Sequence, residues 1–370
     1  MFTGSVSSLC SLSPLYLTYL DLSSNLLTGP LPDCWEKFKS LQVLNLAKNN
    51  LSGRLPKSLG NLRQIESLHL NNKNFSGTLP AWVGHNLHQL VILRLRENKF
   101  HGSIPTSLCN LTFLQVLDLF KNNITGKIPQ CLSCIIALSN LKFPRKTIFY
   151  STSAPVGFDS GQTRLFIDEA ILAWKGKNRE YGKILGLMTI IDLSCNHLSG
   201  EIPNSITTLV GLAGLNLSTN NITGFIPNNI GDMQMLESLD LSFNHLYGRM
   251  PLSGKIPEST QLQSFDSSTY VGNNGLCAPP LQNQCPEDGV SPTRSTERND
   301  KDEDEFITLG FYVSMSLGFC AGFWAVCGTL VIKSSWRHAY FRFFHNMNDW
   351  ICVGLVVLRA RMKKRFQAQD

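Results

Sequence analysis

One phrase returns along the chain from Leu17 to Pro251, and it constrains the fold more than any other feature. The phrase is L-x-x-L-x-L-x-x-N-x-L-x-G-x-(I/L)-P, and its step is 24 residues; residues 41–56 and 114–129 carry it in full. A single copy cannot bury its own leucines, so neighbouring copies must stack to form a continuous core. The sequence therefore predicts a solenoid of parallel strands.

The asparagine of the phrase lets the copies be counted. Eight copies are recognisable, at Asn25, Asn49, Lys73, Asn98, Asn122, Asn196, Asn220 and Asn244. A buried Asn amide can satisfy backbone groups where the chain turns off a strand, because it both donates and accepts hydrogen bonds. Lys73 cannot accept one, so we expect a looser turn at that copy.

The phrase is that of the leucine-rich repeat, and its Gly-x-Ile-Pro ending resembles the plant type. The resemblance implies short helical or 3-10 turns, a second short strand or turn in each copy, and a superhelical twist. A Gly that can take positive φ and a Pro that cannot donate to a strand ladder suit a tight bend beside an edge strand.

A single apolar run follows the repeats. Residues 306–332 are 27 residues without a charge, enough for a helix of about 40 Å that exceeds the hydrocarbon core of a bilayer. The net charge of +6 equals the surplus of Lys and Arg from Lys333 onward, whereas residues 300–305 are almost entirely acidic. The basic charge therefore indicates membrane topology rather than nucleic-acid binding, with the repeats outside and the C-terminus in the cytosol.

Glycosylation motifs and cysteines fit an extracellular repeat region. Six N-x-(S/T) motifs precede the apolar run and none follows it, at Asn50, Asn74, Asn110, Asn123, Asn216 and Asn221. Such motifs also arise by chance in Asn-rich repeats. Among the cysteines, Cys10 lies one repeat step before Cys34, Cys109 lies 22 and 25 residues before Cys131 and Cys134, and Cys277 and Cys285 bracket a short loop. We interpret these as disulfides, with either Cys131 or Cys134 as the partner of Cys109.

The repeats are interrupted between Asn122 and Asn196. That stretch is one repeat plus fifty residues and contains no L-x-x-L-x-L phrase, so we interpret it as an inserted segment; two decayed repeats are the alternative. Within it, Ala173-Trp174-Lys175-Gly176 and residues 180–185, leading into Ile191-Asp192-Leu193-Ser194, resemble the island border of plant receptor-like proteins. Residues 252–258, 261–265 and 272–277 look like the C-terminal cap of the same family.

The resemblance covers essentially the whole chain, as the C-terminal part of a kinase-less plant receptor-like protein of the Cf and EIX-receptor type. It implies cell-surface receptors, many of them in pathogen perception and a few in development, which dock a partner kinase through the membrane helix. The 38 residues after Ile332 are too few for a kinase domain. The expected order is repeats in 1–129, an island in 130–187, repeats in 188–257, a cap in 258–285, an acidic spacer in 286–305, a transmembrane helix in 306–332 and a basic cytoplasmic tail in 333–370.

Two places indicate a shortened chain. Met1 lies inside the end of an earlier repeat and no signal peptide precedes it, so we expect an N-terminal cap and further repeats to be missing. Gly248 is followed by its equivalent Gly254 after six residues, so one repeat is expected to have lost eighteen.

Residues that flank the core leucines of a strand face the concave side of the solenoid. Most are small, but His69, Arg94, Arg96 and Phe120 come from three consecutive strands and predict a cationic and aromatic patch. It is either an ordinary solvated surface or a ligand contact. No catalytic set, cofactor motif or metal-ligand spacing is present, which argues against an enzyme.

The apolar run and the tail carry two further patterns. Gly310, Ser314, Gly318 and Gly322 repeat every four residues, which would give a membrane helix a face that another helix can approach closely. Residues 350–358 are apolar but too short to span a bilayer, and the basic residues after them favour an interfacial helix.

From these features we expect a plasma-membrane receptor. Its concave face and island would bind a peptide, glycan or protein, and its helix would recruit a separate receptor kinase. The alternatives are an extracellular inhibitor built on the same repeat, and a non-signalling decoy or truncated pseudogene product.

Overall fold

The computed structural model describes residues 1–12, 16–71, 74–144, 149–152, 164–167, 170–174, 177–181, 185–249, 267–277, 281, 283 and 285. All of them belong to one compact unit, Met1–Ser291. Among the described residues no helix is long and apolar enough to cross a bilayer. The predicted transmembrane helix, the spacer, the tail and the shortened repeat after Gly248 lie outside them.

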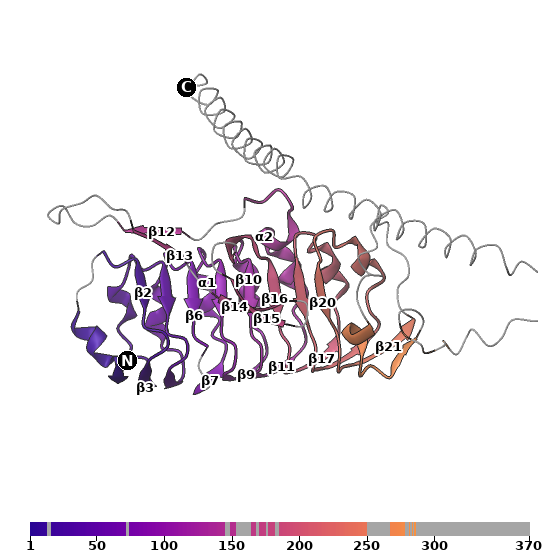
Figure 1. Ribbon diagram of the computed structural model, residues 1–370, viewed down its shortest axis with the longest axis horizontal. Coiled ribbons are helices and arrows are strands. Elements are labelled where there is room, and N and C mark those ends of the chain that lie inside the picture. The colour runs from indigo at the N-terminus through magenta and orange to yellow at the C-terminus, as the bar shows by residue number, and fades with distance from the viewer. Residues whose placement is uncertain are drawn as a thin grey trace, which may run out of the picture. The chain divides into compact units, whose positions relative to one another are not determined.

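The described repeats form a solenoid with two parallel sheets running along its length (Figure 1). The first sheet has eight strands, one from each copy of L-x-L: β2 Tyr19–Asp21, β4 Val43–Asn45, β6 Ser67–His69, β8 Ile92–Arg94, β10 Val116–Asp118, β16 Ile190–Asp192, β18 Gly214–Asn216 and β20 Ser238–Asp240. The middle residue of each strand is a leucine or isoleucine that points into the core, so its two neighbours lie on the concave face.

The second sheet has ten strands and follows the ladder asparagines: β1 Thr3–Gly4, β3 Leu26–Pro30, β5 Asn50–Gly53, β7 Asn74–Thr78, β9 Lys99–Gly102, β11 Asn123–Gly126, β17 His197–Glu201, β19 Asn221–Gly224, β21 His245–Arg249 and β22 Gly275–Cys277. It confirms the second short strand that the plant-type ending implies. The glycine of the phrase has positive φ in these strands, for example +90° at Gly53 and +82° at Gly126, where a side chain would be strained.

Short helices close each repeat on the side away from the first sheet. They are η1 Val6–Ser11, η2 Trp35–Lys37, η3 Lys57–Asn61, α1 Trp82–Asn86, η4 Thr106–Asn110, η5 Gln130–Cys134, α2 Ile136–Ser139, η6 Leu185–Leu187, η7 Asn204–Thr208, η8 Asn228–Asp232 and η10 Ser267–Tyr270, where η marks a 3-10 helix. A repeat of this length leaves room for only one or two turns, which suits the 3-10 form.

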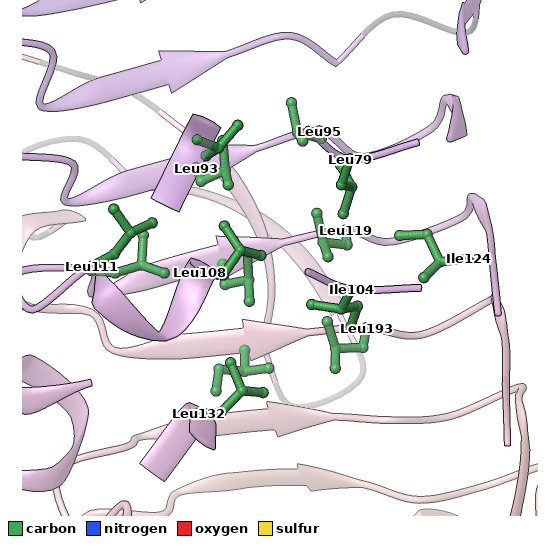
Figure 2. Close-up of a cluster of buried hydrophobic side chains, with 14 of the residues drawn as sticks. Leu79, Leu93, Leu95, Ile104, Leu108, Leu111, Leu119, Ile124, Leu132 and Leu193 are labelled. Atoms are coloured by element: carbon green, nitrogen blue, oxygen red, sulfur yellow. The ribbon is translucent and has the colours of Figure 1, made fainter. Parts of the chain in front are cut away.

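The core between sheets and helices is a single stack of aliphatic side chains. Figure 2 shows Leu95, Leu119 and Leu193 of three successive repeats lying one above another, with Leu108 and Leu132 stacked in the same way. All five are at most 1% exposed. Truncating such a leucine to alanine typically costs about 2–5 kcal/mol.

The ladder asparagine performs the predicted role. Asn49 Oδ1 accepts the Leu27 N–H at 3.0 Å, and its Nδ2 donates to the Leu22 and Leu46 carbonyls. The same pattern joins Asn98, Asn122, Asn196, Asn220 and Asn244 to their preceding repeats. Lys73 lies outside the described residues, so the looser turn stays a prediction.

The cap contains one more ladder position than we predicted. Asn273 Oδ1 accepts the Leu246 N–H at 3.0 Å, and Asn273 Nδ2 donates to the Leu241 and Tyr270 carbonyls. The surrounding sequence lacks the L-x-x-L-x-L phrase, which hid this copy. A ninth coil therefore closes the described solenoid, with β22 paired to β21.

The interruption is an insertion and not two decayed repeats. Strand β10 pairs directly with β16, and Asn196 Nδ2 donates to the Leu119 carbonyl across the gap. Helix η5 and the following α2 still belong to the repeat, because Leu132 and Leu138 lie in the core and Leu138 accepts the Gly211 N–H. The inserted segment thus starts after α2, later than the predicted residue 130.

The described parts of the insertion are two antiparallel hairpins. Strand β12 Phe149–Thr152 pairs with β13 Arg164–Ile167, and β14 Ala170–Trp174 pairs with β15 Lys177–Tyr181. The second hairpin lies over the strands of the first sheet in Figure 1 and returns the chain to β16 through η6. It brings residues with no repeat equivalent onto the concave side.

Candidate ligand-binding face

The concave face includes two outward rows on the first sheet, and the residues that follow the strands, such as Arg96 and Phe120, lie next to them. The pairing register places Asp21, Asn45, His69, Arg94, Asp118, Asp192, Asn216 and Asp240 side by side along one row. The other row contains the first residue of each strand. At the centre of the sheet these residues are aliphatic. The sheet thus carries a polar row and a partly apolar row side by side.

Three of the four predicted patch residues belong to one buried charged network. Arg94 Nε lies 3.4 Å and Arg96 Nη1 3.5 Å from the same atom, Asp118 Oδ2. Arg94 Nη1 lies 3.2 Å from His69 Nδ1, and His69 Nε2 lies 2.7 Å from Ser67 Oγ. Opposite charges and polar partners are present together, as buried ionic groups require.

Phe120 completes the predicted patch as an aromatic partner. The guanidinium carbon of Arg96 lies 4.7 Å from the centre of the Phe120 ring, within the range of a cation–π contact. The structure therefore brings all four predicted residues together. The repeat register was sufficient to find them, whereas Asp118, the common acceptor of both arginines, was missed because D-L-x triplets recur in the repeats as scaffold.

The exposure of this patch differs from our prediction. His69, Arg94 and Arg96 are 1%, 3% and 6% exposed, and only Phe120 is half-buried. An open concave face would leave such side chains in water. The prediction of a solvated surface is therefore wrong for these three residues.

The second hairpin packs on the apolar row next to these residues. Leu172, with Trp174 and Tyr181, packs in a cluster with residues of the apolar row that are almost fully buried. That cluster is separate from the main core and includes Val43, Val91, Ile92, Val116 and Ile190. The inserted hairpin thus forms a second hydrophobic contact, on the outside of the solenoid.

Asp192 lies beside Asp118 in the polar row and is almost fully buried. Ser194 donates to its Oδ1 from both N and Oγ, at 3.1 and 2.5 Å, but Oδ2 is buried and has no hydrogen-bond partner among the described residues. Burial, together with the neighbouring Asp118 carboxylate, raises the pKa of Asp192 to about 7. The hydrogen bonds from Ser194 and the charge of Arg96 act in the opposite direction but are weaker.

The polar row is open at both ends of the sheet. Asp21 is exposed and accepts from Asn45 Nδ2 at 3.2 Å, and at the other end Asn216 and Asp240 are half-buried. A ligand that approaches the concave side therefore meets carboxylate and amide groups on either side of the covered centre. Among the described residues no group of His, Cys, Asp and Glu is suited to hold a metal ion.

The predicted glycosylation residues fall on three parts of the surface: the second sheet, the end of η4 and the concave row. Asn50, Asn74, Asn123 and Asn221 begin strands of the second sheet, and Asn110 ends η4; all are exposed except Asn74, which is half-buried. Asn216 differs, because it lies on the concave row. Its Oδ1 accepts from Ser218, which leaves Nδ2 as the atom that a sugar would occupy.

Three disulfides join the predicted cysteines. Cys10 bonds to Cys34, Cys277 to Cys285, and Cys109 to Cys131, whereas Cys134 is a free, exposed thiol. The predicted helix-packing residues Gly310, Ser314, Gly318 and Gly322 lie outside the described residues.

Models of the leucine-rich repeat match residues 16–75, 89–111, 113–135, 187–246 and 235–261. The chain is 45% identical to receptor-like protein EIX2 of Solanum lycopersicum over 99% of its own length and 40% of that protein. It is 41% identical to receptor-like protein 7 of Arabidopsis thaliana over 49% of its length and 20% of that protein. The chain thus spans about two fifths of the length of the first of these relatives.

Solved ectodomains share the fold. The Arabidopsis thaliana receptor kinase GASSHO1/SCHENGEN3, in complex with CASPARIAN STRIP INTEGRITY FACTOR 2, matches with a TM-score of 0.57 and 29% identity over 76% of this chain and 27% of that one. The Arabidopsis receptor kinase HAESA was solved in complex with the peptide hormone IDA and the co-receptor SERK1. It matches with a TM-score of 0.54 and 29% identity over 75% of this chain and 37% of that one. The chain is therefore a leucine-rich-repeat protein that belongs, over nearly its whole length, with the plant receptor-like proteins.

Proposed function

We propose that this chain is the membrane-proximal part of a plant cell-surface receptor that binds an extracellular ligand. The observation that carries the proposal is the inserted hairpin lying on the concave strands, which places a non-repeating element beside a polar row. Repeats alone give a uniform face, whereas specificity needs side chains that occur only once. We expect the ligand to contact the open ends of the polar row and the edge of the hairpin.

A peptide is the ligand class with most support. Two solved relatives with TM-scores above 0.5 are in complex with CASPARIAN STRIP INTEGRITY FACTOR 2 and with the peptide hormone IDA. An extended peptide can use a row of amide and carboxylate groups on adjacent strands. Glycans and proteins remain alternatives, and a role in defence rests on the resemblance to the tomato receptor-like proteins.

We propose further that the protein is not an enzyme and signals through a partner kinase. Residues 306–332 can form a membrane helix with small residues on one face, which suits packing against the helix of a partner. HAESA was solved with the co-receptor SERK1, which is a precedent for a co-receptor beside such repeats. The orientation we propose is single-pass, with glycosylated repeats outside and the basic tail in the cytosol.

The test uses the full chain, supplied with a secretion signal and a tag at the C-terminus and expressed in leaf cells. External protease should remove the repeats from intact cells while the tag stays protected, and the tag should co-purify a transmembrane kinase identified by its phosphorylating activity. Release of the repeats into the medium would favour the extracellular inhibitor. A protein that reaches the cell surface but co-purifies no kinase would favour the non-signalling decoy.

A further inference from the structure

Three cysteines lie together where the chain leaves the repeats for the inserted segment. Cys109 lies in η4, and Cys131 and Cys134 lie near the two ends of η5, in the next repeat. The disulfide joins Cys109 to Cys131, with their Cα atoms 5.6 Å apart. Cys134 is a free thiol and is exposed.

The repeat register places both cysteines of η5 beside Cys109. Leu108 and Leu132 are equivalent core residues one step apart, so the residue opposite Cys109 is Ser133. Cys131 precedes that position by two residues and Cys134 follows it by one. A 3-10 helix has three residues per turn, so residues i and i+3 lie on the same face, and the face that carries Cys131 also carries Cys134.

We propose that Cys134 exchanges with Cys131 as the disulfide partner of Cys109. The Cys134 thiolate attacks Cys109 Sγ, the new Cys109–Cys134 bond forms, and the Cys109–Cys131 bond breaks. Cys131 leaves as a thiolate and takes up the proton that Cys134 lost, so the number of disulfides is unchanged and no oxidant is needed.

The exchange moves the covalent link by one turn of η5, toward the inserted segment. The disulfide then lies next to Ile135 and α2, the last elements before that segment, instead of at the start of η5. The other two disulfides, Cys10–Cys34 and Cys277–Cys285, have no free cysteine on an adjoining 3-10 helix among the described residues. Among the described residues, the remaining free cysteine is Cys195, which lies on the turn after β16 and not in a 3-10 helix beside a disulfide.

Disulfide mapping of the full chain tests the proposal. The purified protein is equilibrated at mildly alkaline pH, where thiolates form. It is then blocked with a maleimide, deglycosylated because Asn110 adjoins Cys109, and digested with chymotrypsin, which cleaves after Leu132 and separates Cys131 from Cys134. We expect Cys109 to be found linked to both cysteines, with the share of the Cys134 link rising during equilibration. The Cys10–Cys34 pair should keep a single partner throughout.

Two variants sharpen the test. Cys131→Ser should contain a Cys109–Cys134 disulfide and no maleimide on either residue, whereas Cys134→Ser should contain only Cys109–Cys131. A wild-type protein that shows Cys109 linked to Cys131 alone after equilibration would overturn the proposal. So would a Cys131→Ser protein in which Cys109 and Cys134 are both labelled. The wild-type measurement decides the question even where the Cys131→Ser variant does not fold.

Discussion

The Trp174 ring of the inserted hairpin lies over Gly214 of strand β18, so closely that a Cβ at Gly214 would be 3.2 Å from the ring atom Cζ3. A glycine at this point of the apolar row makes room for the indole. The other strands carry residues with a side chain at the equivalent position, such as Ile190 and Ser238. The hairpin and the solenoid therefore fit each other at a specific residue pair.

Replacing Trp174 with Ala should loosen the hairpin without unfolding the solenoid. The indole belongs to the outer cluster, which is separate from the main core. Hydrogen exchange of β14 and β15 is expected to speed up while the ladder amides of the repeats stay protected. Phe225→Ala is a matched control, because Phe225 is an exposed aromatic residue away from the hairpin. Equal exchange in both variants would mean that Trp174 does not anchor the hairpin.

Asp118→Asn should destabilise the protein by about 3–5 kcal/mol, because it leaves the buried charges of Arg94 and Arg96 without their shared partner. Asp240→Asn, at the equivalent position of a half-buried site, should cost less than about 1 kcal/mol. Denaturant unfolding of the ectodomain in the two variants gives the comparison. Similar losses would show that the ion pairs contribute nothing beyond the backbone hydrogen bond that each carboxylate accepts, from Phe120 at Asp118 and from Ser242 at Asp240.

The same network changes what the arginines are expected to do. On an exposed face, Arg94→Ala with Arg96→Ala would affect ligand binding alone. In this structure both are buried, so the double variant should also unfold more readily and reach the cell surface in smaller amounts. A double variant with wild-type stability and surface abundance would contradict the buried network.

Asp192 predicts a pH dependence of stability with a defined sign. The pKa of Asp192 is about 7 in the folded protein, above the value of about 4 in an unfolded chain. The folded state therefore holds this proton more tightly, so the contribution is fully present at low pH and is lost as pH rises through about 7. Asp192→Asn is neutral at every pH and keeps an oxygen for Ser194. Unfolding curves measured between pH 5 and pH 8 should show that the stability of Asp192→Asn increases relative to that of the wild type as the pH rises.

The repeat fold followed from the sequence because one constraint recurs. Each leucine and each Asn, such as Asn122, has equivalents that must occupy the same environment, so the period alone defines the strands and the core. The ladder position at Asn273 was not predicted, because its copy keeps the Asn but not the leucine phrase. The position of the hairpin around Trp174 could not be predicted, because the hairpin has no repeat equivalents and its place on the concave face depends on a tertiary contact.

The last prediction concerns Gly84, where α1 packs against the next repeat. A Cβ at this residue would overlap the backbone carbonyl of Ser107. Because this carbonyl belongs to the backbone and not to a flexible side chain, it cannot move without shifting η4. Gly84→Ala should therefore displace a repeat helix and cost more than about 2 kcal/mol, in spite of the higher helix propensity of Ala. His85→Ala, at the adjacent exposed position of the same helix, should change stability by less than about 0.5 kcal/mol. Thermal unfolding of the two variants checks the difference, and a Gly84→Ala protein as stable as His85→Ala would show that the two helices can move apart at little cost.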